Sequence, residues 1–162
     1  MSDLLLQIKA DMKDAMRNKE KVRLTAIRML LAAIKQIEVD QRIEVDDTGI
    51  LVILDKMVKQ RKDSISQFEA AAETERASGN QELAASRQEL ADNEKEEIEA
   101  LQGYMPQALS DAEVSELVDA ALKESGAETM RDMGKVMAIL KPQLQGRADI
   151  GAVSGIIKAK LG

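Results

Sequence analysis

A chain of 162 residues, 44% hydrophobic and 32% charged, has the size and composition of one globular domain or two small ones. It contains no cysteine and no histidine, which excludes disulfide bonds, thiolate metal sites and catalysis by a histidine base. The formal net charge of −6 argues against a protein that coats nucleic acid over its whole surface.

The near absence of aromatic residues and prolines favours helices. Phe68 and Tyr104 are the only aromatic residues, and Pro106 and Pro142 are the only prolines. The core must therefore be built from Leu, Ile, Val, Ala and Met, and long stretches contain no residue that breaks a helix. We predict an all-α fold.

The first residues predict neither a signal peptide nor a membrane anchor. Met1-Ser2-Asp3 leads into an amphipathic run that has no basic n-region and no apolar h-region. No apolar run approaches the roughly 20 residues that span a bilayer. We expect a cytoplasmic protein that does not contact a membrane.

Two helices are predicted at the N-terminus. The first covers residues 3–17 with Ser2 as its N-cap, and the second begins near Glu20 and runs past Ile37. The first helix places five apolar residues on one face: Leu4, Leu5, Ile8, Met12 and Met16.

Two longer helices are expected next, separated by Ser78-Gly79-Asn80. The third follows the capping residues 46–49 and carries apolar residues, together with Arg61, at steps of three and four. The fourth is strongly acidic and runs to about Leu101. Within it, Gln81-Glu82-Leu83-Ala84 recurs one heptad later at residues 88–91, which predicts an antiparallel, coiled-coil-like hairpin.

The predicted domain boundary lies at Gly103-Tyr104-Met105-Pro106, where the composition changes. It separates an N-terminal domain of four helices, residues 1–103, from a C-terminal domain of three short helices, residues 104–162. Ser110 and Glu113 have the spacing of a capping box, Gly126 ends the helix that they open, and Asp149 begins the last helix. Met130, Met133 and Met137 are interpreted as core residues of this domain.

Two patterns resemble catalytic or cofactor sites, but each lacks residues that the site would require. The acidic run from Glu94 to Glu99 lacks the histidines of a di-iron site, so we interpret it as a solvated helix face. Gly134-Lys135 lacks the earlier glycine and the following Ser or Thr of a phosphate-binding loop. We therefore expect no metal, no cofactor and no catalytic residue.

The basic residues near the C-terminus are the remaining candidates. Residues 131–162 hold six Lys or Arg and only two acids, among several glycines. Scattered lysines on solvated faces are the simpler interpretation; glycines at helix N-termini combined with cations also suit phosphate oxygens. The candidate RNA-binding residues are Gly134, Lys135, Lys141, Arg147, Gly151, Lys158 and Lys160. Because aromatic residues are so few, structured RNA read by shape fits better than stacked single strands.

Several segments resemble the GatB/YqeY family, and together they cover nearly the whole chain. They are Arg23-Leu24 with Ile27-Arg28, Val58-Lys59-Gln60-Arg61-Lys62-Asp63-Ser64, Tyr104-Met105-Pro106-Gln107, Asp132-Met133-Gly134-Lys135-Val136-Met137, Gly146-Arg147-Ala148-Asp149, and the final helix from Val153 to Leu161. The chain is similar to the free-standing YqeY-like members, whose helical region also forms the tail of the B subunit of the glutamine-dependent aminoacyl-tRNA amidotransferase. The segment from Ala70 to about Ser86 looks longer than is usual for that family.

The resemblance implies a binding protein. In the amidotransferase the tail grips the tRNA body while the chemistry occurs elsewhere, and 162 residues accommodate only the tail-type region. A family label of carbon–nitrogen ligase with glutamine as amido donor would therefore describe the amidotransferase assembly of the relatives and not this chain. We expect a non-catalytic module that binds the tRNA body or tRNA-associated enzymes; the alternative is a protein-interaction adaptor that docks on a tRNA-processing or amidotransferase enzyme through its acidic helices.

Overall fold

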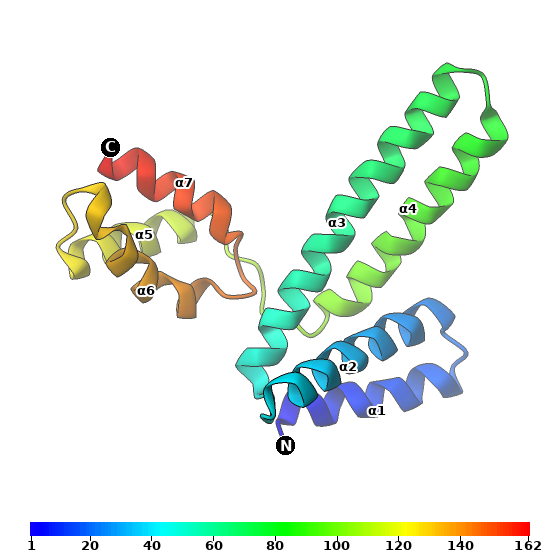
Figure 1. Ribbon diagram of the computed structural model, residues 1–162, viewed down its shortest axis with the longest axis horizontal. Coiled ribbons are helices and arrows are strands. Elements are labelled where there is room, and N and C mark those ends of the chain that lie inside the picture. Colours follow the sequence, from blue (N-terminus) through cyan, green and yellow to red (C-terminus); the bar gives the residue numbers. More distant parts are fainter. The chain divides into compact units, whose positions relative to one another are not determined.

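The computed structural model describes residues 1–162 as seven α-helices and one 3-10 turn, without a β-strand. The all-α prediction is confirmed. The chain forms two compact units, Met1–Met105 and Pro106–Gly162 (Figure 1). No helix combines the length and the apolar character that crossing a membrane requires.

The N-terminal unit is built from two helix pairs. Helix α1 (Asp3–Arg17) is followed by α2 (Lys21–Gln41), α3 (Asp47–Ala77) and α4 (Gln81–Gln102). Helices α3 and α4 form a long hairpin, and α1 and α2 pack at its base (Figure 1). The starts of three helices are capped by side chains that accept a backbone N–H, from Ser2, Asp46 and Asn80.

The hydrophobic core of this unit lies at the base of the hairpin. Residues from all four helices and Val45 contribute to one buried cluster. Its fully buried large side chains include Ile8, Ile27, Leu30, Ile50, Leu54 and Leu101. On α1, Ala15 is buried and Met16 is 51% exposed, because the helix turns the smaller side chain toward α2. No residue between Ser66 and Glu97 belongs to the cluster.

Beyond this core, only small residues are buried between α3 and α4. They are Ala72, Ala84 and Ala91, and the last two lie one heptad apart in the duplicated Gln-Glu-Leu-Ala segment. Alanine at such positions allows two helices to approach closely but removes little apolar surface from water. The distal part of the hairpin therefore contributes little hydrophobic stabilisation.

One buried charge lies where α2 meets the hairpin. The Arg61 side chain is 8% exposed, and its Nε donates to Glu97 at 2.9 Å. The guanidinium also donates to the Met57 carbonyl and contacts the Met29 sulfur of α2. Arg61 thus links α2, α3 and α4, and its hydrogen-bond partners offset the cost of burying its charge.

The acidic run of α4 is only partly a solvated face. Glu96 and Glu99 are exposed, whereas Glu94 and Glu97 are half-buried. Burial, with a smaller contribution from the nearby Glu97 charge, raises the pKa of Glu94, and Arg61 partly offsets this. The expectation of a uniformly solvated run fails because α4 turns two of its glutamates toward Arg61.

We expect Glu94→Gln to stabilise the protein at neutral pH. Because the folded state raises the pKa of Glu94, that state binds its proton more tightly than the unfolded chain does. Ionisation of Glu94 therefore costs stability as the pH rises through the folded pKa. Urea denaturation should show the variant to be more stable than wild type at pH 7, with the advantage disappearing below pH 4.5, the ordinary value for a glutamate. An equal advantage at both pH values would refute this account.

The C-terminal unit contains α5 (Asp111–Ser125), the 3-10 turn η1 (Met130–Asp132), α6 (Met133–Leu144) and α7 (Ile150–Leu161). Ser110 and Glu113 form the expected capping box, and Gly126 ends α5 with a φ of 64°. Eight buried residues form the core: Val114, Val118, Ala121, Val136, Leu140, Leu144, Val153 and Ile157. Met133 and Met137 pack against this core, but Met130 is 43% exposed, so the methionine stripe is only partly a core feature.

Candidate nucleic-acid interface

Both acids of the basic C-terminal stretch are engaged in capping. The Asp132 carboxylate accepts the backbone N–H groups of Glu128 and Thr129, and these hydrogen bonds lower the pKa of Asp132. The Asp149 carboxylate accepts the N–H of Gly151 at 2.9 Å at the start of α7. The two negative charges are held at backbone amides, and Lys141 of α6 and Lys158 of α7 have no acidic partner.

Three of the predicted cations project into solvent. Lys135, in the first turn of α6, is 72% exposed and only distantly paired with Asp132 at 3.9 Å. Lys141, near the end of α6, and Lys158, in the last turn of α7, are exposed and form no salt bridge. Lys135 and Lys141 are six residues apart, about 9 Å along the helix axis. These three ammonium groups are available to an anion.

The other two predicted cations also serve the fold of the unit. Lys160 forms an ion pair with Asp119 of α5. The Arg147 Nε donates to the Gln107 carbonyl at 3.2 Å, and its own carbonyl accepts the Leu109 N–H at 2.8 Å. Arg147 thereby ties the segment before α5 to the turn between α6 and α7. Each side chain is therefore partly engaged by a contact within the unit.

The predicted glycines, Gly134 and Gly151, differ in their surroundings, and Gly155 lies one helical turn after Gly151 on α7. A Cβ added at Gly134 or at Gly155 would meet no atom within 4 Å, so neither glycine is required by packing inside the unit. Gly151 is also exposed, but its N–H is already bonded to Asp149. Close helix–helix approach within the unit therefore does not explain Gly151 and Gly155. The surface at Gly134 and Gly155 is open, because no atom lies within 4 Å of the position where a side chain would begin.

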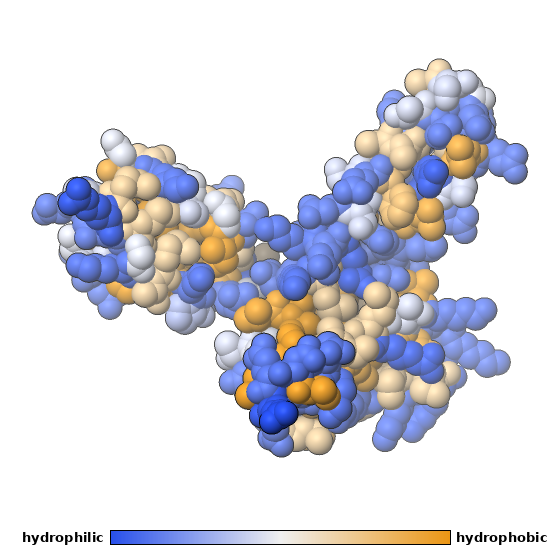
Figure 2. All heavy atoms as spheres, in the orientation of Figure 1, coloured by the Kyte–Doolittle hydropathy of each residue, from blue (hydrophilic) through white to orange (hydrophobic).

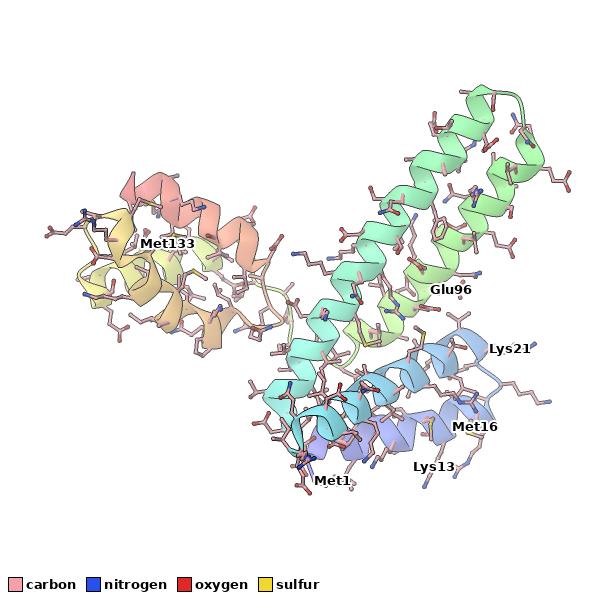
Figure 3. The ribbon with its side chains drawn as sticks, viewed as in Figure 1. Met1, Lys13, Met16, Lys21, Glu96 and Met133 are labelled. Atoms are coloured by element: carbon pink, nitrogen blue, oxygen red, sulfur yellow. The ribbon has the colours of Figure 1, made fainter.

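A second basic area lies at one end of the N-terminal unit, outside the predicted site residues. Lys13 and Lys21 lie with Met16 at the end of the α1–α2 pair, and their side chains point outward (Figure 3). Arg17 and Lys19 are exposed in the same region. The signal was present, because residues 1–35 hold eight Lys or Arg against four acids. The charge count alone, however, does not show that these side chains lie together.

Two segments that carry the family resemblance meet in the N-terminal unit. The Tyr104 hydroxyl donates to Asp11 at 2.7 Å, and Arg23 lies 3.9 Å from the same carboxylate while bonding Glu20 at 2.8 Å. Burial and the Asp11 hydrogen bond raise the pKa of Tyr104 well above its usual value. Tyr104 is therefore a protonated donor at neutral pH, and it attaches the end of α4 to α1.

No cluster of three or more His, Cys, Asp or Glu side chains forms a metal site. The exposed lysines are cationic hydrogen-bond donors, which attract phosphate and carboxylate groups.

Comparison with known proteins supports the family and corrects one expectation. The model of the YqeY-like protein family matches residues 5–161. Three fungal relatives named "Altered inheritance of mitochondria protein 41, mitochondrial" are similar: those of Pyrenophora tritici-repentis (29% identical over 147 residues, 90% of this chain and 73% of the relative), Candida glabrata (31% over 155 residues, 94% and 74%) and Lachancea thermotolerans (34% over 125 residues, 75% and 59%).

Their names contradict the cytoplasmic location expected above. That expectation was wrong because it rested on features missing from the sequence, and a missing leader or span does not identify a compartment. The chain spans between 59% and 74% of the length of these relatives. The match over residues 5–161 shows that the chain belongs to the YqeY-like protein family.

Proposed function

We propose that this protein is a non-catalytic module that binds structured RNA of the tRNA type through its C-terminal unit, residues 106–162. The observation that carries the proposal is the exposure of Lys135, Lys141 and Lys158 on two helices that contain no Asp or Glu, while the acids that precede these helices, Asp132 and Asp149, accept backbone N–H groups. The relation of the YqeY family to the amidotransferase tail supports it. The names of the fungal relatives mention mitochondrial inheritance and no ligand.

The mode of binding follows from the side chains present. Lysines supply point charges for phosphates and carry no base-edge specificity, so affinity should depend on RNA shape and on salt. The open surface at Gly134 and Gly155 permits a sugar–phosphate backbone to approach α6 and α7 closely. Tyr104 is held by Asp11 and is not free to stack on bases. Sequence-independent contact with a folded RNA is the recognition that these groups support.

The test is a titration of bulk tRNA with the full-length protein across a salt series. The triple variant Lys135→Gln, Lys141→Gln, Lys158→Gln should bind at least about tenfold more weakly at low salt. The slope of log affinity against log salt should become less negative by about two to three, because three phosphate contacts are removed. Arg147 and Lys160 are left intact because they also brace the fold.

The matched control is Lys123→Gln, which removes an exposed lysine from α5 of the same unit. Its affinity should stay close to that of wild type. Absence of tRNA binding by the wild type at low salt would refute the proposal. Equal losses in Lys123→Gln and in single variants at the proposed face would show only a non-specific charge effect. In the first case an adaptor that binds protein and not RNA would replace the proposal; in the second, the binding face would not be the one proposed.

A further inference from the structure

The helical face that α2 covers at the base of the hairpin continues, uncovered, toward its tip. Arg61 marks the junction, because it bonds Glu97 of α4 and contacts Met29 of α2. Beyond it, α3 runs sixteen more residues to Ala77, and α4 begins at Gln81, sixteen residues before Glu97. Each helix thus projects about 24 Å past the junction. No residue of this stretch between Ser66 and Glu97 belongs to the core cluster.

One stripe of α4 runs along the projecting part. Leu83, Arg87, Leu90 and Glu94 follow each other at steps of four, three and four, so they share one face of the helix. Leu83 and Leu90 lie fourteen and seven residues before Glu97, on the side of α4 that Glu97 presents at the junction. Leu90 is 41% exposed and Leu83 is half-buried. Every second residue of this stripe is apolar, and no helix of the unit covers the stripe.

Helix α3 borders this stripe. The Arg61–Glu97 pair sets the antiparallel register, so Ala71, ten residues past Arg61, lies level with Arg87, ten residues before Glu97. By the same register, Phe68 lies level with Leu90. Both α3 residues are half-buried. We call this surface the distal face; Figure 2 shows apolar atoms on the distal half of the hairpin among hydrophilic ones. It is formed by Phe68, Ala71, Leu83, Arg87, Leu90 and Glu94.

The surroundings of the distal face are acidic. Residues 62–96 hold nine acids and four Lys or Arg. Two of these cations are already paired within the hairpin, Lys95 with Glu69 and Arg76 with Glu73. Glu75, Glu82, Glu89 and Glu96 form no salt bridge. The potential over the distal face is therefore negative, and a partner with Lys or Arg along its edges is favoured.

Two polar atoms of the stripe still lack a hydrogen-bond partner. They are the Nε of Arg87 and the Oε2 of Glu94. Most buried polar atoms in proteins are paired, and an unpaired one costs stability. A Lys or Arg of a docked helix, level with Glu94, would supply a donor after a small rotation of the carboxylate.

We propose that the distal face of the α3–α4 hairpin docks an amphipathic helix of another protein, with an apolar stripe flanked by Lys and Arg. The helix continues the packing that α2 provides at the base, in the helix-in-groove mode of recognition. A second copy of this chain is disfavoured as the occupant because two acidic hairpins repel each other. The proposal concerns the N-terminal unit and does not depend on RNA binding.

The test uses the full-length protein and a synthetic 18-residue peptide with Leu at helical spacing and Lys elsewhere. Its control is a scrambled peptide of the same composition, which carries the same charge but no apolar stripe. The amphipathic peptide should bind roughly tenfold more tightly than the scrambled one. Fluorescence anisotropy measures both affinities. Equal affinities would overturn the proposal, because they would show attraction by charge alone.

Leu90→Glu locates the site. The substitution adds a negative charge, so it strengthens a purely electrostatic attraction but weakens apolar docking. It should abolish the preference for the amphipathic peptide, whereas Leu6→Glu, at a 51% exposed leucine of α1, should preserve it. The uncharged Leu90→Gln serves as a second variant, with circular dichroism confirming the helical fold of each. An unchanged preference in the Leu90 variants, or the same loss in Leu6→Glu, would refute the site. A wild-type dimer in sedimentation that Leu90→Glu dissociates would assign the face to a second copy instead.

Discussion

Arg61→Ala should lower the free energy of unfolding by about 3–5 kcal/mol, the cost of removing one partner of a buried ion pair. The guanidinium is 8% exposed and bonds Glu97, which is itself 19% exposed. Its loss leaves Glu97 beside Glu94 without a compensating charge and opens a cavity between α2 and the hairpin. The pKa of Glu94, which Arg61 now holds down, should rise further.

The matched control is Arg76→Ala on the same helix. Arg76 pairs with Glu73 at 3.0 Å, but its side chain is 44% exposed, so solvent screens the interaction. Its loss should cost about 0–1 kcal/mol. Urea denaturation of both variants at pH 7 measures how much free energy of unfolding each one loses relative to wild type. If the two variants lost equal stability, the burial of Arg61 would have no energetic consequence, and its place at the junction would be incidental.

Leu140→Ala should unfold the C-terminal unit selectively. Leu140 is fully buried among only eight core residues, and such a truncation costs about 2–5 kcal/mol. A unit of this size has little stability to lose. We therefore expect differential scanning calorimetry to show one melting transition shifted to much lower temperature or lost, while the transition of residues 1–105 is retained.

Ile156→Ala on α7 provides the control, because Ile156 is 37% exposed and its truncation should leave both transitions nearly unchanged. A single transition that moves as a whole in Leu140→Ala would show that the two units fold as one cooperative structure. That outcome would also contradict the proposal that the chain consists of two domains divided near residue 103.

The candidate interface was only partly accessible from the sequence. The excess of cations over residues 131–162 can be counted in the sequence. Whether each cation is free to bind a partner cannot be counted in the same way, because the contacts that occupy these side chains come from distant positions in the sequence. Lys160 is paired with Asp119, 41 residues away, and Arg147 bonds the Gln107 carbonyl, 40 residues away. The glycines posed the same difficulty, since only the packed unit shows that a Cβ at Gly155 would meet nothing.

The sequence by itself determined where several of the helices begin. Ser2, Asn80 and Ser110 cap helices at the positions that their spacing predicted, because a capping side chain bonds an N–H only two or three residues away. The tertiary structure alone decided which polar side chains on those helices are buried and paired. Arg61 reaches Glu97 across 36 positions, and Tyr104 reaches Asp11 across 93. Such pairs depend on how whole helices pack, which is the sum of many weak contacts; a local pattern therefore could not show that Glu94 and Glu97 turn inward while Glu96 stays in solvent.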